Sequence, residues 1–335
     1  MSGPGWLPAL VGVNALGEGD RPSLRGEDFE VLAGILRQRA VVSDEQRQTA
    51  DTFGFKWHKR ETFESDASVA RMKAWLVERY GDVEGAAWWP EHGERPVVLD
   101  AGCGGALSAL ALFEGVLPDV RYVGVDISDA VDVAAARFAE RGIDAGFVQA
   151  DLNRIPLPDG SVDVLFSEGV LHHTDSTRDA LLATARLLAP GGRYLFYVYR
   201  RKGPLREFTD DYVRDRLQAM APDEAWDAVM PLTKLGRLLG DLHVEVDVPE
   251  DIHLLEIPAG PIDLQRLFYW HVFKAFHHPE LSLDELNHIN FDWYAPRNAH
   301  RQSPEEVRAW CAAAGLEIER EVVEDAGITI VARRV

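Results

Sequence analysis

The stretch "VVLDAGCGGALSA", residues 97–109, joins an apolar run, an aspartate and a turn rich in glycine. The apolar run is typical of a buried strand, and the glycines indicate a tight turn before the next helix. Gly102 and Gly104 have no Cβ, so the backbone of this turn can approach a ligand closely. In a doubly wound sheet, the first turn from strand to helix lies at the rim of the ligand site. We therefore expect a ligand to lie against this turn.

The residues around the turn alternate between apolar strands and helices. The pattern predicts strands over 95–102, 121–128, 145–151, 161–169 and 193–200. It predicts helices over 108–117, 129–142 and 177–192. Apolar strands separated by helices of this length predict parallel βαβ units, with helices on both faces of the sheet.

Regular structure returns at residues 303–335. Ser303 is expected to cap a helix, with Pro304 in the first turn and Glu306 completing a capping box. Gly315 would end that helix before two further strands. The predicted fold class is therefore α/β: a Rossmann-like, doubly wound, mostly parallel sheet of seven strands.

Residues 201–302 interrupt this alternation and are too many for a structureless loop inside a compact domain. Their apolar residues recur mainly at helical spacing, although residues 243–258 could hold a strand. Ahead of the core, residues 26–40 are interpreted as a helix. We therefore expect an N-terminal helical arm or lid, a core in two parts and a helical cap over the substrate, at residues 1–65, 66–200 with 303–335, and 201–302.

The composition limits the partners. With 55 acidic and 35 basic residues the net charge is −20, a field that repels nucleic acids. Cys103 and Cys311 have no spacing typical of a disulfide framework or a zinc site, so we expect no metal. Residues 1–20 lack the basic start and apolar core of a signal peptide, and no run of about 18 apolar residues occurs. We expect a cytoplasmic protein with neither a nucleic-acid nor a membrane partner.

Two carboxylates flank the predicted ligand site. Asp100 lies inside the glycine turn, and Asp126 ends the second strand of the core. A dinucleotide fingerprint would have a third glycine where Ala106 stands, and Asp100 would repel a pyrophosphate but not a cation. An acidic residue placed like Asp126 can hold two ribose hydroxyls. These features predict a nucleoside with a positively charged, amine-bearing tail.

With these features the chain resembles the class I S-adenosylmethionine-dependent methyltransferases that act on small molecules. The resemblance rests on the "DAGCGG" turn, on "VDVLFSEGVLHH" (162–173) and on "LLAPGGRYLFYV" (187–198), and it covers residues 95–200 with the tail from 303. It implies S-adenosylmethionine as the cofactor and S-adenosylhomocysteine as its product. The implied reaction is methyl transfer to an oxygen, nitrogen or carbon of a small metabolite, above all in specialised metabolism.

The resemblance also assigns roles to residues. Around the cofactor it places Asp100, Gly102, Cys103 and Gly104 at the methionine part, Asp126 and Ile127 at the ribose and adenine, Asp151 and Leu152 at the adenine edge, Ser167 near the methyl group, and Trp57 on a segment that closes over the cofactor. Glu168 and His172 follow as catalytic candidates. The insertion, rich in aromatic residues and histidines, supplies expected substrate contacts at Tyr294, Arg297 and His271, and a further catalytic candidate at His300.

Several of these residues have a purely structural alternative. Asp126 could cap the next helix, Asp151 could belong to a turn, and His172 with its neighbour His173 could be packing residues. The segment 53–57 has aromatic residues at alternate positions, as in a strand that packs the N-terminal arm onto the core.

Two other functions also stay open from the sequence. The acceptor could be a protein or peptide side chain, or the chain could be a non-catalytic subunit that binds the cofactor. The oligomeric state is open too, a homodimer included.

Overall fold

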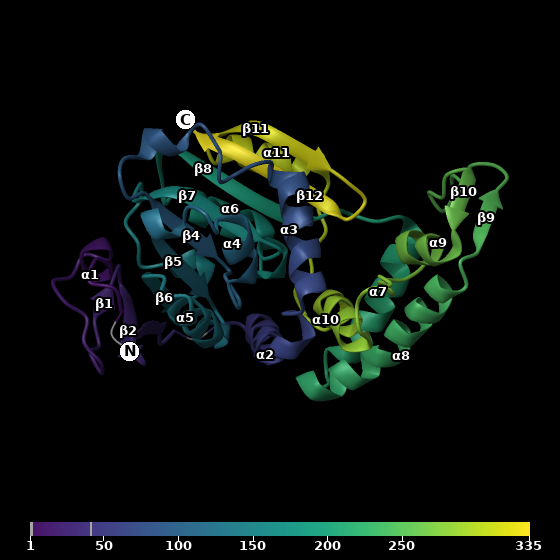
Figure 1. Ribbon diagram of the computed structural model, residues 1–335, viewed down its shortest axis with the longest axis horizontal. Coiled ribbons are helices and arrows are strands. Elements are labelled where there is room, and N and C mark those ends of the chain that lie inside the picture. Colours follow the sequence, from purple (N-terminus) through teal and green to yellow (C-terminus); the bar gives the residue numbers. More distant parts are fainter. Residues whose placement is uncertain (1–2, 41) are drawn as a thin grey trace.

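The computed structural model describes residues 3–40 and 42–335, which form an α/β fold around one large sheet (Figure 1). Within this part of the chain the large sheet has ten strands, and a separate hairpin has two. The strands of the large sheet are β1 (Ser23–Leu24), β2 (Glu27–Leu32), β3 (Ile35–Gln38), β4 (Val97–Ala101), β5 (Arg121–Asp126), β6 (Ala145–Gln149), β7 (Val162–Glu168), β8 (Leu188–Tyr199), β11 (Leu316–Val323) and β12 (Gly327–Arg334). The hairpin consists of β9 (Glu245–Val248) and β10 (Gly260–Asp263).

The helices fall into three groups along the chain. Those before the core are α1 (Leu7–Leu10), α2 (Asp44–His58) and α3 (Asp66–Tyr80). Those of the core are α4 (Leu107–Leu112), α5 (Ala130–Glu140), α6 (Thr177–Ala185) and α11 (Pro304–Ala313). Those of the insertion are α7 (Pro204–Leu217), α8 (Pro222–Asp241), α9 (Leu264–His271) and α10 (Leu283–Tyr294).

The strand order confirms the predicted fold class. It runs β1-β2-β3-β6-β5-β4-β7-β8-β12-β11, and neighbours from β3 to β8 are parallel. The two C-terminal strands pair antiparallel, β12 with β8 and β11 with β12. Because the order reverses between β4 and β7, the switch point of this doubly wound sheet lies at their carboxyl ends, where such sheets bind ligands.

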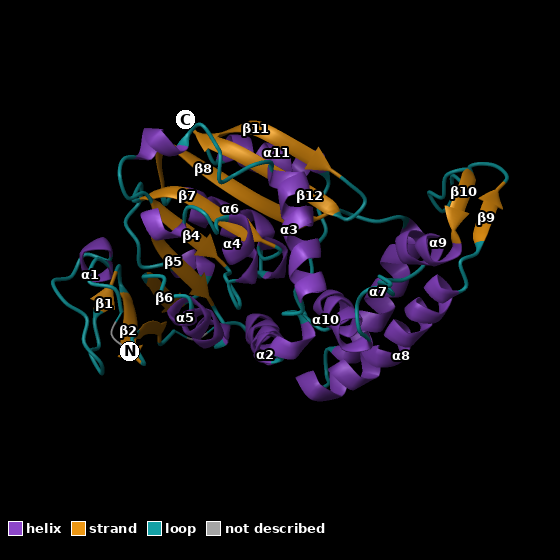
Figure 2. Cartoon of the chain, viewed as in Figure 1, coloured by secondary structure: helices purple, strands orange, loops and turns teal. Residues whose placement is uncertain are grey.

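Helices cover both faces of the sheet (Figure 2). On one face α6 and α11 pack over apolar side chains such as Leu99 and Val125. On the other face α3, α4 and α5 pack over Val98 and Tyr122. Strands β4 and β5 are therefore buried from both sides, which explains why the sequence shows them as nearly continuous apolar runs.

The N-terminal segment differs from the prediction. Residues 26–40 form β2 and β3 rather than a helix, so the sheet has ten strands instead of seven. Ala33 and Gly34 both have positive φ, 56° and 76°, as a two-residue hairpin turn with right-handed twist requires. Phe29 and Val31 alternate on the buried side, and β3 adds in parallel to β6. Pairing with the sheet edge outweighs the local helical pattern.

The aromatic segment 53–57 also differs from its prediction, because it is helical rather than extended. Ser43 caps α2, its Oγ accepting a hydrogen bond from the Gln46 backbone at 3.0 Å. On a helix Phe53 and Trp57 are one turn apart and share a face. Both side chains line the cavity of the candidate site.

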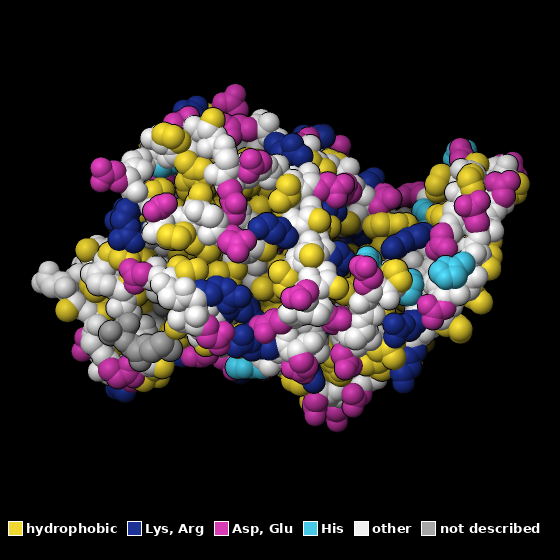
Figure 3. All heavy atoms as spheres, in the orientation of Figure 1, with side chains coloured by type: hydrophobic (Ala, Val, Ile, Leu, Met, Phe, Trp, Pro, Cys, Tyr) yellow, Lys and Arg dark blue, Asp and Glu magenta, His cyan; other side chains and the backbone are white. Residues whose placement is uncertain are grey.

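The insertion lies beside the core, on the side opposite the N-terminal strands, with the β9–β10 hairpin at its far end (Figure 1). Regular core structure resumes at α11, where Ser303 and Glu306 form the predicted capping box. Acidic side chains are scattered over the face shown in Figure 3, in keeping with the net charge of −20. Among the described helices, none has both the length and the apolar character needed to cross a membrane.

Candidate functional site

A cavity of about 490 Å³ lies at the carboxyl ends of β4, β5 and β7 and reaches the helical insertion. From the core it is lined by Gly102, Ser108, Asp126, Ile127, Asp151, Leu152, Glu168, Gly169, Val170, His173, Thr174, Tyr197, Tyr199 and Ala326. From α2 and α3 it is lined by Gln46, Thr49, Phe53, Lys56, Trp57, Arg71, Met72, Trp75 and Arg79. From the insertion it is lined by Arg266, Tyr269, Trp270, Lys274, Phe276, Ile289 and Asp292. Its position at the switch point and its size are typical of a small-molecule site.

The glycine turn forms one wall of this cavity. Gly102 has φ of 86°, and its backbone N–H donates to the Val125 carbonyl at 2.7 Å. A Cβ at Gly102 would lie 2.1 Å from Val170, and one at Gly104 would lie 2.5 Å from the indole nitrogen of Trp57. These glycines are therefore required by close packing as well as by backbone conformation. Trp57 covers the turn from the side of α2.

Asp126 lies in the cavity wall with most of its carboxylate already engaged. Its Oδ2 accepts from the Gly104 backbone at 2.8 Å. Its Oδ1 accepts from the Ser128 backbone at 2.8 Å and from the Ser128 hydroxyl at 2.6 Å. A carboxylate has about four acceptor positions, so one on Oδ2 remains for a ligand. Burial raises the pKa of Asp126, although the bonds from Ser128 and Gly104 oppose that rise.

Three further residues with a predicted cofactor role lie beside Asp126 in the lining, namely Ile127, Asp151 and Leu152. The Asp151 carboxylate accepts from the Asn153 backbone at 2.9 Å, as the structural alternative of a turn residue predicts. Its own N–H donates to Gln38 at 3.0 Å. Strand β3 therefore supports this edge of the cavity, which the predicted N-terminal helix would not have done.

Four residues with a predicted cofactor role do not lie in the lining. The Asp100 carboxylate is buried and accepts from the Tyr122 hydroxyl at 2.6 Å, and burial raises its pKa to about 7. Gly104 lies under Trp57, and Cys103 is buried in the core. Ser167 is buried and donates to the Ala101 carbonyl at 2.8 Å. The side chains of Asp100, Cys103 and Ser167 are buried outside the cavity lining, and their roles at the cofactor stay predictions.

Glu168, a predicted catalytic residue, ends β7 in the cavity wall. Its Oε2 accepts from the Tyr80 hydroxyl of α3. Burial raises the pKa of Glu168 to about 8, although the bond from Tyr80 and the charge of Arg79 oppose that rise. At neutral pH the side chain is therefore mostly a carboxylic acid, able to donate a hydrogen bond inside the cavity.

The raised pKa of Glu168 predicts how Glu168→Gln changes the dependence of stability on pH. The folded protein binds this proton more tightly than the unfolded chain, so the stability that Glu168 contributes is lost as the pH rises from about 4.5 to about 8. Glutamine has no such titration. The variant should therefore gain stability relative to the wild type as the pH is raised through this window, as measured by urea unfolding at several pH values.

The control is Glu317→Gln, on an exposed position of β11. If Glu168→Gln and Glu317→Gln show the same difference from the wild type at every pH, Glu168 is not held as a buried acid.

His173 lies in the lining, one residue after the predicted His172. Its Nδ1 lies 2.6 Å from the Asn298 carbonyl, which only accepts, so Nδ1 carries the proton. Its Nε2 has no hydrogen-bond partner in the described part of the chain. Burial lowers the pKa of His173 to about 4, although the charge of Asp292 opposes this. At neutral pH, Nε2 therefore keeps a free lone pair.

The other two predicted catalytic residues, His172 and His300, lie outside the cavity lining. His172 is fully buried outside the lining, its ring 3.6 Å from that of Tyr199 between centroids. His300 is exposed, and its Nε2 lies 3.1 Å from the Thr174 carbonyl. The short turn at residues 171–173 places only the second histidine of the pair in the cavity wall.

The three residues predicted to contact the substrate also lie outside the lining. Tyr294 is fully buried below the wall and donates to Asp210 at 2.9 Å. Arg297 is exposed and lies 3.7 Å from Glu45. His271 ends α9 outside the lining, where its neighbours Tyr269 and Trp270 do line the cavity.

An ion pair between Lys56 of α2 and Asp292 of α10 lies in the middle of the cavity wall. Asp292 also accepts from the Tyr199 hydroxyl at 2.9 Å. Burial alone would raise the pKa of Asp292, but the Lys56 ammonium holds it well below its usual range. The ion pair links α2 to helix α10 of the insertion. Within the described residues, no three histidine, cysteine, aspartate or glutamate side chains gather as a metal site would require.

Comparisons with known proteins agree with this reading of the fold. Residues 99–196 match a family described as "Methyltransferase domain". An uncharacterised 37.1 kDa protein in a transposon of Streptomyces fradiae is 35% identical over 95 residues, which is 28% of each chain. An uncharacterised methyltransferase of Mycobacterium tuberculosis is 37% identical over 95 residues, 28% of this chain and 46% of the relative. The chain thus matches less than half the length of these relatives.

Among solved structures, the 1,6-didemethyltoxoflavin-N1-methyltransferase of Burkholderia thailandensis aligns over 93% of this chain and 96% of its own, with 14% identity and a TM-score of 0.46. The doubly wound sheet defines a Rossmann-like α/β protein with a ligand site at its switch point. The match to the methyltransferase domain family runs from β4 into β8 of this sheet.

Proposed function

We propose that this protein transfers a methyl group from S-adenosylmethionine to an oxygen, nitrogen or carbon atom of a small metabolite inside the cavity. One observation carries the proposal: a single cavity joins the glycine turn and Asp126 to His173 and the wall of the insertion. A cofactor held at the first end and an acceptor held at the second would meet in the same cavity. Positioning of this kind supplies much of the rate of a displacement reaction.

The residues at the first end fit the cofactor. Gly102 is half-buried in the wall, with Val170 packed where a Cβ would lie, and Asp126 keeps one acceptor position for a ribose hydroxyl. Ile127 and Leu152 offer apolar contact for a flat adenine. Rotation of the Ser128 hydroxyl would free a second acceptor position for the other ribose hydroxyl. When bound, the sulfonium group supplies an electrophilic methyl and leaves as a neutral thioether.

We expect Asp126→Asn to weaken the binding of S-adenosylhomocysteine by about 10- to 100-fold, because a charged acceptor contributes about 1.5–3 kcal/mol to a hydrogen bond. Isothermal titration calorimetry measures this directly. The control is Asp129→Asn, whose carboxylate is largely exposed and lies 3.2 Å from His58 outside the lining. If the two variants bound S-adenosylhomocysteine with equal affinity, Asp126 would not be a ligand of the cofactor.

His173 is proposed to accept the proton that a hydroxyl or ammonium acceptor must lose. The hydrogen bond from Nδ1 to Asn298 fixes the ring, and Nε2 is buried with its lone pair unpaired, so a small turn of the ring would be needed to bring it to the acceptor. The carboxylate of Asp292 favours the resulting imidazolium, since it already raises the pKa of His173 against the effect of burial. Glu168, as a carboxylic acid, is proposed to orient the acceptor by donating a hydrogen bond.

The walls of the cavity favour a small acceptor over a protein side chain. Helices α2, α3, α9 and α10 all contribute side chains to it, and the Lys56–Asp292 ion pair joins two of these helices. An acceptor must therefore fit inside about 490 Å³ together with the cofactor.

The test uses the purified protein, S-adenosylmethionine labelled in its methyl group and a cell extract divided into small-molecule and protein fractions. We expect label in the small-molecule fraction alone. Label in proteins alone would replace the proposal with a protein-modifying enzyme. Binding of S-adenosylhomocysteine without any transfer would replace it with a non-catalytic subunit.

A further inference from the structure

Five basic side chains line the cavity, and only two of them have an acidic partner. Lys56 pairs with Asp292, and Arg79 pairs with Glu324. The other three, Arg71, Arg266 and Lys274, form no ion pair with any described carboxylate. Acidic residues outnumber basic ones 55 to 35 in this chain, so cations without partners need an explanation. A cation in a partly dry cavity costs free energy unless an anion joins it.

Two of these cations, Arg71 and Arg266, lie close to two aromatic rings of the insertion. The Arg71 guanidinium lies 5.3 Å from the centre of the Phe276 ring. That of Arg266 lies 5.9 Å from Phe276 and 5.6 Å from Tyr269. The two rings lie 5.8 Å apart, and the Lys274 ammonium lies 4.9 Å from the centre of a third ring, that of Trp293. The wall thus combines flat apolar surface with positive charge from two helices, α3 and α9, and from the loop after α9.

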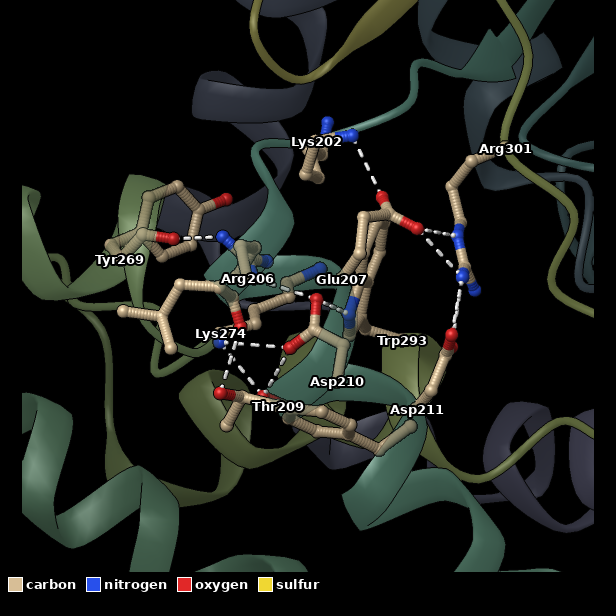
Figure 4. Close-up of polar contacts among 12 residues, drawn as sticks. Lys202, Arg206, Glu207, Thr209, Asp210, Asp211, Tyr269, Lys274, Trp293 and Arg301 are labelled. Atoms are coloured by element: carbon tan, nitrogen blue, oxygen red, sulfur yellow. Dashed lines mark hydrogen bonds and ion pairs between the residues drawn. The ribbon is translucent and has the colours of Figure 1, made fainter. Parts of the chain in front are cut away.

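A buried polar network holds this wall in place (Figure 4). Asp210 of α7 accepts from Arg206 at 2.6 Å and from the indole of Trp293 at 2.7 Å. Arg206 in turn donates to the Tyr269 carbonyl. The Lys274 backbone N–H lies 3.3 Å from Asp210. Tyr269 and Lys274 are therefore positioned through their backbones before any ligand binds, as a specific binding wall requires.

The charges of the cavity are divided between its two ends. The acidic side chains Asp126, Asp151 and Glu168 lie at the carboxyl ends of the strands. Two of the unpaired cations come from the insertion and the third, Arg71, from α3, and the one acidic lining residue of the insertion, Asp292, is paired with Lys56. Burial also lowers the pKa of Lys274, to about 7, although the charge of Asp292 opposes this. An anion beside the ammonium would restore its charge. A cationic cofactor at one end and an anionic group at the other would complement this division.

We propose that the methyl acceptor carries a negatively charged group on a flat apolar body, and that Arg71, Arg266 and Lys274 bind that group at the insertion end of the cavity. Carboxylate, sulfonate and phosphate share the required chemistry. This proposal rests on the proposed function in one respect: the bound anion is a methyl acceptor only if the protein transfers methyl groups. The anion site itself depends only on the three cations and the two rings.

The test compares two fluorescent probes with the same aromatic rings. One is 8-anilinonaphthalene-1-sulfonate, and the other is N-phenyl-1-naphthylamine, which lacks the sulfonate. Each is titrated into the protein saturated with S-adenosylhomocysteine. We expect the sulfonate to bind at least about 10-fold more tightly than the neutral probe, and Arg71→Met and Lys274→Met each to remove about 10-fold of that affinity while the neutral probe keeps its own.

Arg216→Met and Lys234→Met are the matched controls, on exposed positions of α7 and α8, and should change neither probe. The anion site is refuted if Arg71→Met and Lys274→Met leave both affinities unchanged or weaken both probes equally. Failure of the proposed function looks different: S-adenosylhomocysteine would not bind by calorimetry. The two probes, titrated without it, would still decide the anion site.

Discussion

Replacing His173 with asparagine is expected to slow methyl transfer by about 100- to 10,000-fold, the usual contribution of a positioned general base. The asparagine amide can still donate to the Asn298 carbonyl, so the local packing keeps its polar contact while Nε2 is lost. The measurement is the initial rate of label transfer from S-adenosylmethionine to the acceptor found in the small-molecule fraction. Affinity for S-adenosylhomocysteine, measured alongside, should stay within about 2-fold of the wild type.

The matched variant is His253→Asn, at an exposed position between β9 and β10. It should transfer label at the wild-type rate. If His173→Asn does so too, no proton passes to His173, and the acceptor is an atom whose attack needs positioning alone.

Replacing Asp210 with alanine is expected to lower the free energy of unfolding by about 3–5 kcal/mol, because a buried guanidinium then loses its counter-charge. Asp210 and Arg206 are both about 1% exposed and pair at 2.6 Å. The indole of Trp293 and the hydroxyl of Tyr294 lose their acceptor as well. Urea unfolding followed by circular dichroism measures the change.

Asp215→Ala is the control on the same helix, at an exposed position with no side-chain partner among the described residues. A surface substitution of this kind changes stability by about 0.5 kcal/mol or less. A similar loss in the two variants would mean that the Asp210 network contributes little to the folded insertion.

The core of the fold could be predicted from the sequence because its signals are local. Strands β4 and β5 are buried on both faces, so their residues are apolar almost throughout, and glycines mark the turn at residue 102. The capping box at Ser303 lies within four residues and needs no tertiary contact. Patterns of this kind survive in any context that lets the sheet form.

The N-terminal strands could not be predicted in this way. Residues 26–40 read locally as a helix, and their extended form depends on β3 pairing with β6, more than 100 residues further along the chain. Conversely, the aromatic residues at alternate positions in 53–57 suggested a strand, but the cap at Ser43 begins a helix that continues through them. Tertiary pairing decided the first case and capping the second.

The residues of the candidate site also fall into two groups, those with a local sequence signal and those placed only by tertiary packing. Asp126 was located by its place at the end of a strand, which is a local signal, and it lies in the cavity. The contacts of the insertion join residues far apart in sequence, such as Lys56 with Asp292, and no spacing rule reveals them. In the His172–His173 pair, a single step along a short turn decides which ring faces the cavity. Such choices depend on packing and not on composition.

Calorimetric titration of the purified protein with S-adenosylhomocysteine tests the account most directly. We expect saturable binding of one molecule per chain, weakened by Asp126→Asn and kept by Asp129→Asn. A folded protein that takes up no S-adenosylhomocysteine at any accessible concentration would contradict it.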